Sequence, residues 1–272
     1  KSGNTWLRFF IISLLIGKKT DLNLSHLRAI INYPHSTQFN DLISNLLDFN
    51  EIAKNWIASQ KKINSDKNLR FFKTHNMLGK FRGFPFTNSE NTLGAIYIVR
   101  DPRNVITSIA NHYSMNINES YNFMIDSNRI LTADKWGSDN FGISDVLGSW
   151  SQHYKSWQNI KFAPILNIKY EDLISDTKKT FLEIINFLQK FTNIKINNKK
   201  ISKTIESCNF EKLRKMEKDE GFIEAVYSKK SNKKVEFFHL GKKNNWENLL
   251  NQEIEKKIRK VFHDEMKELS YI

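Results

Sequence analysis

The sequence predicts an α/β protein with a central parallel sheet flanked by helices on both faces. Short runs rich in β-branched and aromatic residues alternate along the chain with longer amphipathic runs, which is typical of parallel strands joined by helices. The chain has 272 residues but only 10 Gly and 4 Pro, so we expect a single domain over residues 1–272. Contents of 40% hydrophobic and 26% charged residues exclude a fibrous or mostly disordered chain.

The first predicted element is a buried helix over residues 6–17. Its sequence, WLRFFIISLLIG, is apolar except for Arg8. A run of about a dozen residues is too short to cross a bilayer, which takes about 20, and no small-residue cleavage site of a signal peptide follows it. The chain begins inside the turn-forming segment KSGNT at residues 1–5, so we expect the natural protein to have a β-strand before Lys1.

Three strands are predicted in the rest of the chain. Each is a short run of β-branched or aromatic residues that is bounded by turn-forming residues. They cover residues 69–73, 94–99 and 164–168.

The helices between and after these strands are predicted from caps and apolar spacing. Asp101 is a good N-cap and Pro102 suits the first helical position, so a helix is expected from there to about Tyr113. Three further helices are expected: one capped by Ser144 with Val146, Trp150, Tyr154 and Trp157 on one face, one from Asp176 to Leu188, and one from about Leu249 with Ile254, Ile258, Val261, Phe262 and Met266.

The charge and cysteine content limit the partners and the compartment. Lys and Arg exceed Asp and Glu by 13, which attracts nucleic acid, an anionic membrane surface or a phosphorylated small molecule. The single cysteine, Cys208, cannot form a disulfide within the chain, so we expect a cytoplasmic protein. The seven histidines lack metal-ligand spacing, and we expect no metal.

Two polar segments are expected at the carboxyl ends of strands or before a helix, where α/β proteins bind ligands. The Gly-containing loop at residues 1–5 leads into a helix and offers N–H groups to an anion, although an ordinary helix start has the same appearance. Lys73 and His75 follow the strand at 69–73, and His75 is either a general base or a surface histidine.

A third polar pair follows the strand at 94–99. Arg100 ends this strand, and Ser108 lies eight residues later, two turns into the next helix. The planar guanidinium of Arg100 suits a phosphate. An ion pair of Arg100 with Asp101 or Glu171 is the open alternative.

Five segments, in order along nearly the whole chain, resemble motifs of the PAPS-dependent sulfotransferases, which transfer a sulfuryl group from 3′-phosphoadenosine 5′-phosphosulfate. KSGNTW at 1–6 is similar to the family's YPKSGTTW loop, with Asn4 in place of the first Thr. The others are FFKTH at 71–75, IYIVRDPRNVITS at 96–108, ILNIKYEDL at 165–173, and FFHLGKKNNW at 237–246, which resembles the FxRKGxxGxW segment.

The resemblance implies a P-loop-like sheet and a role for each matching residue. It implies that His75 is the general base and that Lys1 and Lys73 neutralise the leaving phosphate. It implies that the nucleotide is held by Lys1, Ser2, Gly3, Asn4, Thr5 and Trp6, by Arg100 and Ser108 at the 3′-phosphate, by Tyr170, Cys208 and Phe210 at the adenine, and by His239, Gly241 and Lys242 in the last motif.

The chain also departs from the family's motifs. His239-Leu240 replaces the usual Arg-Lys before Gly241, so Lys242, Lys243 or His239 would take the place of those cations. Cys208 stands where a Thr or Ser is usual, and a thiol is a weaker donor.

Two other functions are alternatives to this one. A P-loop kinase that uses ATP and Mg²⁺ should carry a complete GxxxxGK[ST] loop, which this chain lacks. A basic nucleic-acid-binding protein would explain the charge, but the lysines are dispersed rather than clustered with aromatic residues. We therefore expect a small-molecule or carbohydrate acceptor, no nucleic acid and no stable membrane insertion.

Overall fold

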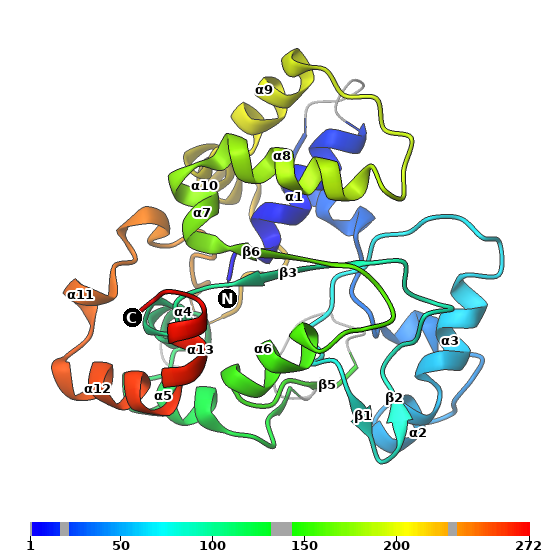
Figure 1. Ribbon diagram of the computed structural model, residues 1–272, viewed down its shortest axis with the longest axis horizontal. Coiled ribbons are helices and arrows are strands. Elements are labelled where there is room, and N and C mark those ends of the chain that lie inside the picture. Colours follow the sequence, from blue (N-terminus) through cyan, green and yellow to red (C-terminus); the bar gives the residue numbers. More distant parts are fainter. Residues whose placement is uncertain (1, 17–21, 132–142, 228–232) are drawn as a thin grey trace. The chain divides into compact units, whose positions relative to one another are not determined.

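Two parallel strands, β3 (Ala95–Val99) and β6 (Ile165–Lys169), form a sheet in the computed structural model, which describes residues 2–16, 22–131, 143–227 and 233–272 (Figure 1). The amide of Ala95 donates to the carbonyl of Pro164 at 3.0 Å, so the two strands start at the same end. Both strands and the α/β class are confirmed.

The strand predicted at 69–73 is wrong. Only Lys73 takes part in a bridge, with Asn32, through hydrogen bonds from Lys73 N to Ile31 O and from Tyr33 N to Lys73 O. Leu69 and Phe72, whose types suggested a buried strand, are 41% and 37% exposed. The aromatic run therefore forms one rung of a parallel ladder and no regular strand.

Local caps fix the helices that the sequence predicted best. In α4 (Pro102–Tyr113) the side chain of Asp101 accepts from the amide of Arg103, and Ser114 ends the helix in the left-handed region at φ 52°. In α8 (Thr177–Leu188) Asp176 caps the amide of Lys179. Both helices are confirmed.

The cap predicted at Ser144 is wrong. Asp145 and Val146 form strand β5, which pairs antiparallel with β4 (Ile130–Leu131). The cap of α6 (Trp150–Gln158) is Ser149, whose hydroxyl accepts from the amide of Gln152 while the Gln152 side chain accepts from the amide of Ser149. This reciprocal pair holds the helix start more firmly than a lone serine does.

The chain divides into two compact units. The first unit comprises Lys1–Ala29, Ile98–Asn122 and Asn167–Ile272, and the second comprises Ile30–Tyr97 and Phe123–Leu166.

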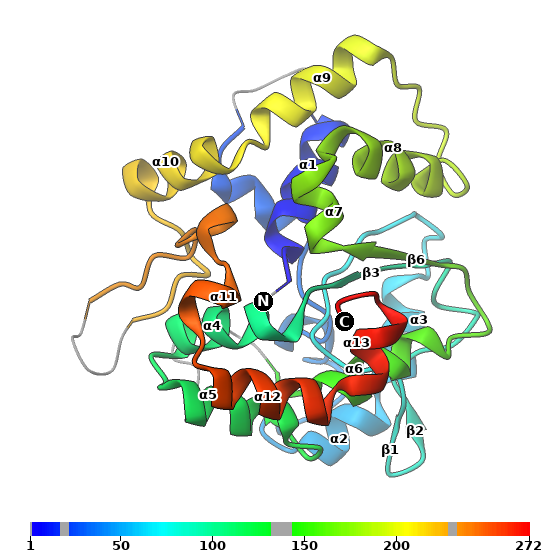
Figure 2. The same ribbon diagram turned by 60° about the vertical axis from the view of Figure 1, so that its left-hand side comes forward.

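Within the first unit, helices lie on both sides of the strand ends. Helices α1 (Asn4–Ile16) and α8 lie on one side, and α4 and α13 (His263–Glu268) lie on the other (Figures 1 and 2). The buried helix predicted near the N-terminus is confirmed, because Phe9, Phe10 and Leu14 of α1 are fully buried. The Phe10 ring stacks on Phe181 of α8 with centroids 3.6 Å apart.

The first unit contains further helices, of which only the C-terminal tail was predicted from the sequence. They are η1 (Leu24–Ala29), α7 (Tyr170–Ser175), α9 (Asn198–Ser207), α10 (Phe210–Glu220), η4 (Gly241–Lys243), α11 (Trp246–Leu249) and α12 (Gln252–Val261), while α5 (Ile117–Ile125) continues from this unit into the second. The apolar stripe predicted for the C-terminal tail is confirmed at Ile254, Ile258, Phe262 and Met266. Val261 differs and is 46% exposed.

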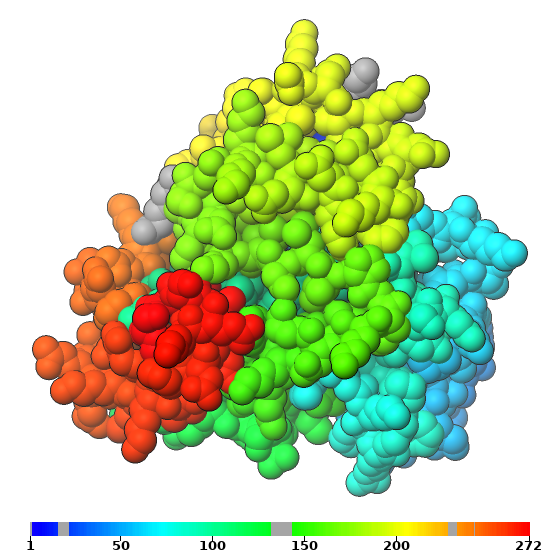
Figure 3. All heavy atoms as spheres, in the orientation of Figure 1, coloured from blue at the N-terminus to red at the C-terminus, as the bar shows by residue number. Residues whose placement is uncertain are grey.

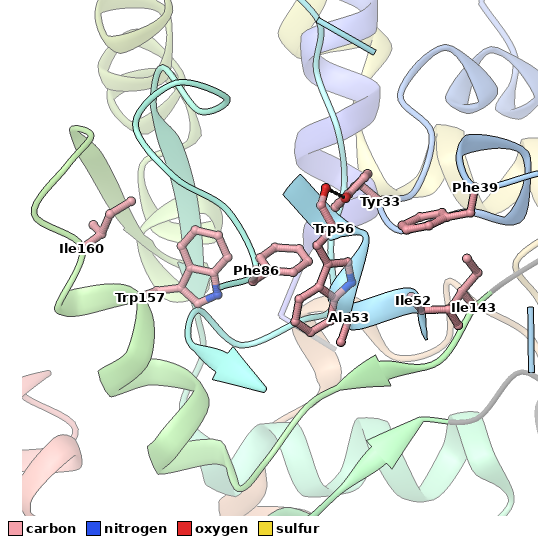
Figure 4. Packing of buried hydrophobic residues seen from close by; sticks show 9 residues of the cluster. All are labelled: Tyr33, Phe39, Ile52, Ala53, Trp56, Phe86, Ile143, Trp157 and Ile160. Carbon is pink, nitrogen blue, oxygen red and sulfur yellow. Dashed lines mark hydrogen bonds between the residues drawn. The ribbon is translucent and has the colours of Figure 1, made fainter. Parts of the chain in front are cut away.

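The second unit has its own aromatic core. Around it lie η2 (Ser36–Gln38), α2 (Phe49–Lys54), α3 (Trp56–Ile63), the hairpin of β1 (Lys80–Phe81) and β2 (Phe84–Pro85), and α6. Figure 4 shows the core residues Tyr33, Phe39, Ile52, Ala53, Trp56, Phe86, Ile143, Trp157 and Ile160. The Tyr33 hydroxyl donates to the carbonyl of Trp56 at 2.7 Å, so its polar end is satisfied inside this core.

Part of the positive charge lies on the surface of α8, α9 and the segment between them, which is yellow-green to yellow in Figure 3. Its exposed lysines are Lys178, Lys179, Lys190, Lys195, Lys199 and Lys203. In the parts of the chain that the structure describes, no helix combines the length and apolar character needed to cross a membrane.

Candidate functional site

The loop before α1 is closed by an aromatic ring. Gly3 has φ +95°, and a Cβ built on it would lie 2.6 Å from Cδ2 of Tyr170. The carbonyl of Gly3 accepts from the amide of Leu7 at 3.1 Å, which begins the helix. Because the first N–H groups of an α-helix have no acceptor within it, this loop and the helix dipole suit an anion.

Gly3→Ala should destabilise the chain more than its backbone angle alone explains. A positive φ costs alanine about 1 kcal/mol, and the contact with Tyr170 adds overpacking of about 1–3 kcal/mol. Gly83→Ala is the matched control, since Gly83 has φ +88° with no atom within 4 Å of the added Cβ. Urea unfolding of both variants measures the difference; equal losses would contradict the close packing of Tyr170 on the loop.

The polar side chains of the same loop are tied to Arg8. The Nε of Arg8 donates to Oδ1 of Asn4 at 2.9 Å, and its Nη2 donates to both carboxylate oxygens of Glu224 at 2.6 and 2.7 Å. The Thr5 hydroxyl also donates to Glu224, at 3.4 Å. The sequence analysis missed this pair, although a lone arginine in an apolar helix signals a buried partner.

Arg100 and Ser108 meet as their spacing predicts. The Nη1 of Arg100 donates to the Ser108 hydroxyl at 3.1 Å, and its guanidinium carbon lies 4.1 Å from the centroid of the Tyr170 ring. Arg100 is buried, and this burial lowers its pKa against the opposing influence of Tyr170 and Glu171. A buried guanidinium and a hydroxyl at a strand end form a site that suits a phosphate.

The acidic neighbours proposed as alternative partners of Arg100 have partners of their own. Asp101 forms an ion pair with Arg103 at 2.7 Å. Glu171 accepts from the amide of Asp101 at 3.1 Å and from the hydroxyl of Tyr271 at 2.9 Å. These contacts position the start of α4 against the C-terminal end of the chain.

The C-terminal motif packs on the predicted adenine-side phenylalanine. A Cβ on Gly241, which has φ +54°, would lie 2.6 Å from the Phe210 ring. Phe210 also contacts Phe238 edge to face, with centroids 6.0 Å apart. His239 is exposed, and the side chain of Lys242 lies outside the described part of the structure.

Two buried residues lie near this motif: Cys208, which the sequence analysis assigned to the site, and Asn244, which it did not. Cys208 is buried, and this burial raises the pKa of its thiol to about 12 while a hydrogen bond with Ser13 opposes the rise. Asn244 was missed, yet its buried amide donates to the Ser108 hydroxyl at 3.0 Å. The sequence contained a signal for this residue, because the FxRKGxxGxW pattern has its second Gly where this chain has Asn244.

In the second unit, the segment after Lys73 is held by side chains from β5 and α6. The side-chain Nδ2 of Asn76 donates to Oδ1 of Asp145 at 2.5 Å, and its Oδ1 accepts from the backbone amide of Val146 at 2.8 Å. The indole of Trp157 donates to the Asn76 carbonyl at 3.0 Å. These bonds fix the backbone that carries His75.

His153 supports the same backbone in a defined tautomer. Its Nε2 lies 3.2 Å from the His75 carbonyl, which can only accept, so Nε2 is the donor. Its Nδ1 then accepts from the hydroxyl of Tyr97 at 3.0 Å. Burial lowers the pKa of His153 to about 4, so the ring is neutral near pH 7.

Asp145 should make stability depend on pH. Burial raises its pKa from 3.8 to about 7, against the opposing charge of Lys73. Between these values the folded chain keeps a proton that the unfolded chain has lost, so this group's contribution to the free energy of unfolding falls as pH rises. The melting temperature of Asp145→Asn relative to that of the wild type should therefore rise as pH increases from about 4 to about 7. The exposed Asp264→Asn is the control, and a constant difference for Asp145→Asn would contradict the raised pKa.

The predicted site residues thus fall in both units. Lys1 lies outside the described residues. Lys73 and His75 belong to the second unit, and the predicted nucleotide residues belong to the first. In the first unit the structure brings Gly3 and Arg100 against the Tyr170 ring, and Arg100 donates a hydrogen bond to Ser108.

Comparison with known proteins gives a match over nearly the whole chain. The family model described as "Sulfotransferase domain" matches residues 1–270. "Sulfotransferase 1A1" of Rattus norvegicus is 29% identical over 44% of this chain, an alignment that spans only 38% of the rat protein. "Flavonol 3-sulfotransferase" of Flaveria bidentis is 23% identical over 98% of this chain and 79% of that protein.

A solved structure with the same fold is retinol dehydratase in complex with androsterone and inactive cofactor PAP. It has a TM-score of 0.61 and 20% identity, and the match covers 98% of this chain and 78% of that chain. This likeness confirms the P-loop-like α/β fold that the sequence predicts.

Proposed function

Because the chain belongs to the sulfotransferase domain family, we propose that it transfers a sulfuryl group from 3′-phosphoadenosine 5′-phosphosulfate to a hydroxyl or amine of a small-molecule or carbohydrate acceptor. The observation that carries the proposal is the buried pair of Arg100 and Ser108, 3.1 Å apart at the end of β3. A 3′-phosphate is the group that distinguishes this donor from ATP, and a guanidinium beside a hydroxyl suits it.

In this proposal, residues of the first unit hold the nucleotide. Arg100 and Ser108 bind the 3′-phosphate, and the loop N–H groups bind the 5′-phosphosulfate. The proposal is supported by Gly3, where a Cβ would meet Tyr170, because a position without a side chain can offer an anion only its backbone N–H. The other proposed nucleotide contacts are Ser2, Asn4, Thr5, Trp6, Tyr170, Cys208, Phe210, His239, Gly241 and Lys242.

The donor, when bound, supplies an activated sulfuryl group on a phosphate leaving group. His75 accepts the proton that the acceptor hydroxyl or amine loses as it attacks sulfur. Lys1 and Lys73 neutralise the negative charge that develops on the leaving oxygen. His153, kept neutral by burial, donates to the His75 carbonyl and holds the backbone of the base in place.

A transfer assay tests the proposal. The purified chain is incubated with donor that carries radiolabelled sulfur and with a panel of phenols, alcohols, amines, lipids and carbohydrates, and the products are identified by mass spectrometry. We expect labelled sulfur in at least one acceptor and release of 3′-phosphoadenosine 5′-phosphate. Transfer of labelled phosphate from ATP to an acceptor, with no transfer of labelled sulfur from the 3′-phosphoadenosine donor, would refute the proposal.

A further inference from the structure

The apolar helix α1 carries one charged residue, Arg8, whose guanidinium is held by partners on two segments. Its Nη2 donates to both carboxylate oxygens of Glu224 at 2.6 and 2.7 Å, and its Nε donates to Oδ1 of Asn4 at 2.9 Å. The side chain of Arg8 is 6% exposed and that of Glu224 is 26% exposed. A guanidinium this buried needs a carboxylate partner, and Glu224 supplies it.

The position of Glu224 is fixed by contacts other than the one with Arg8. Glu224 lies in a turn that is closed by a hydrogen bond from the amide of Ala225 to the carbonyl of Phe222 at 3.2 Å. Phe222 is buried, and its ring stacks on that of Phe238 with centroids 5.8 Å apart. The turn is thus anchored by its own contacts and presents Glu224 as a fixed acceptor for Arg8.

The orientation of the Asn4 amide follows from its contact with Arg8. The Nε of an arginine can only donate, so the atom of Asn4 that faces it must be Oδ1. The Nδ2 of Asn4 is on the other side of the amide, and among the described residues it has no acceptor. Asn4 is also the first residue of α1, where backbone N–H groups lack acceptors within the helix. The side chain and the backbone of this residue thus both offer donors at the start of the helix.

Thr5 differs from Asn4 because its hydroxyl is used within the same cluster. The hydroxyl donates to Glu224 at 3.4 Å and accepts from Nη2 of Arg8 at 3.3 Å. Of the two loop side chains that contact Arg8, Asn4 is therefore the one that keeps a donor for a ligand. We propose that Arg8 and Glu224 are positioning residues that hold the Asn4 amide as a ligand of the nucleotide 5′-phosphate; this inference rests on the proposed function.

The effect of the pair is to orient Asn4 before the nucleotide arrives. An amide side chain that rotates freely loses that freedom when it binds a ligand, which lowers affinity. Held by Arg8, which is itself held by Glu224, the Asn4 side chain has already lost this freedom. Removing the pair should therefore weaken nucleotide binding only through the 5′-phosphate, and only while Asn4 is present.

The test uses Arg8→Met/Glu224→Gln, a variant that removes the pair without leaving a lone buried charge. Neutral replacement of a whole buried ion pair is often harmless to stability, whereas removal of one partner is costly. The matched control is Lys257→Met/Glu253→Gln, which removes an exposed ion pair of α12 with an N–O distance of 2.6 Å. Each chain is titrated by calorimetry with 3′-phosphoadenosine 5′-phosphate and with adenosine 3′-phosphate, which lacks only the 5′-phosphate.

We expect Arg8→Met/Glu224→Gln to weaken 3′-phosphoadenosine 5′-phosphate about three- to tenfold and to leave adenosine 3′-phosphate within about twofold of the wild type. Asn4→Ala should weaken 3′-phosphoadenosine 5′-phosphate about tenfold, as loss of a hydrogen bond to a charged group does. Because the pair acts through Asn4, the variant that combines all three substitutions should lose no more than Asn4→Ala alone. The control should match the wild type for both nucleotides.

The outcomes separate this inference from the proposed function. Equal weakening of both nucleotides, unchanged or tighter binding of 3′-phosphoadenosine 5′-phosphate, or losses that add in the combined variant would overturn the positioning role alone. A wild type that binds neither nucleotide would overturn the proposed function together with it. If Arg8→Met/Glu224→Gln does not fold, Arg8→Lys keeps a cation for Glu224 but lacks the Nε that holds Asn4, and it should show the same selective loss.

Discussion

Replacing His75 with alanine should lower kcat by about 10²–10⁴-fold while leaving affinity for 3′-phosphoadenosine 5′-phosphate within about twofold of the wild type. The acceptor's proton would have no base to receive it, whereas the nucleotide contacts are assigned to other residues. The backbone of the segment should stay in place, because its bonds run through the His75 carbonyl and through Asn76. Steady-state kinetics with an acceptor found in the transfer screen, together with calorimetry, give both quantities.

His263→Ala is the matched control, since His263 is exposed at the start of α13. It should retain wild-type turnover. Full activity of His75→Ala would remove the general base from the proposal. Loss of nucleotide affinity in step with turnover would assign His75 to binding instead.

Arg100→Ala should have the largest effect on nucleotide binding. Removing one partner of a buried, hydrogen-bonded charge pair costs about 2–5 kcal/mol, so the affinity for 3′-phosphoadenosine 5′-phosphate should fall by about 30-fold to several thousandfold. Adenosine 5′-phosphate, which lacks the 3′-phosphate, should lose far less. Calorimetric titration of both nucleotides measures the contrast.

Arg100→Lys separates the charge from the shape of the guanidinium. A lysine keeps the positive charge but loses the planar fork and its stacking on Tyr170, so an intermediate affinity is expected. Unchanged affinity in Arg100→Ala would exclude Arg100 as a phosphate ligand. Thermal melting shows whether a variant has lost its fold rather than one contact.

The parts of the fold that were predicted correctly depend on nearby residues. The start of α4 is determined by Asp101 and Pro102, and that of α8 by Asp176, so each can be read from a few positions. The Ser144 cap failed because the competing cap at Ser149 has a reciprocal partner in Gln152, a signal that lies three residues further on.

The parts that failed depend on distant partners. The run at 69–73 has the composition of a strand, but a strand needs a neighbour over its length, and here only Lys73 has one. Spacing cannot show which segment supplies that neighbour.

The contacts of the candidate site likewise divide into one between nearby residues, which could be predicted, and others between distant residues, which could not. The meeting of Arg100 with Ser108 was predictable because a strand end and the second turn of the next helix face each other. Asn244 reaches Ser108 across 136 positions, and Glu224 reaches Arg8 across 216, so the residues around Asn244 and Arg8 do not show which distant residue each contacts. The resemblance to a family pointed to Arg100 and Ser108, whereas its last motif has Gly at the position of Asn244 and none of its motifs includes Glu224.

Retention of the wild-type chain on a 3′-phosphoadenosine 5′-phosphate matrix tests the central claim most directly. A basic chain with net charge +13 binds many anions, but that binding weakens as salt screens it. We predict retention that persists in high salt and is released by free 3′-phosphoadenosine 5′-phosphate, but not by ATP at the same concentration. Release by salt alone, or equal release by ATP, would contradict a site built for the 3′-phosphate.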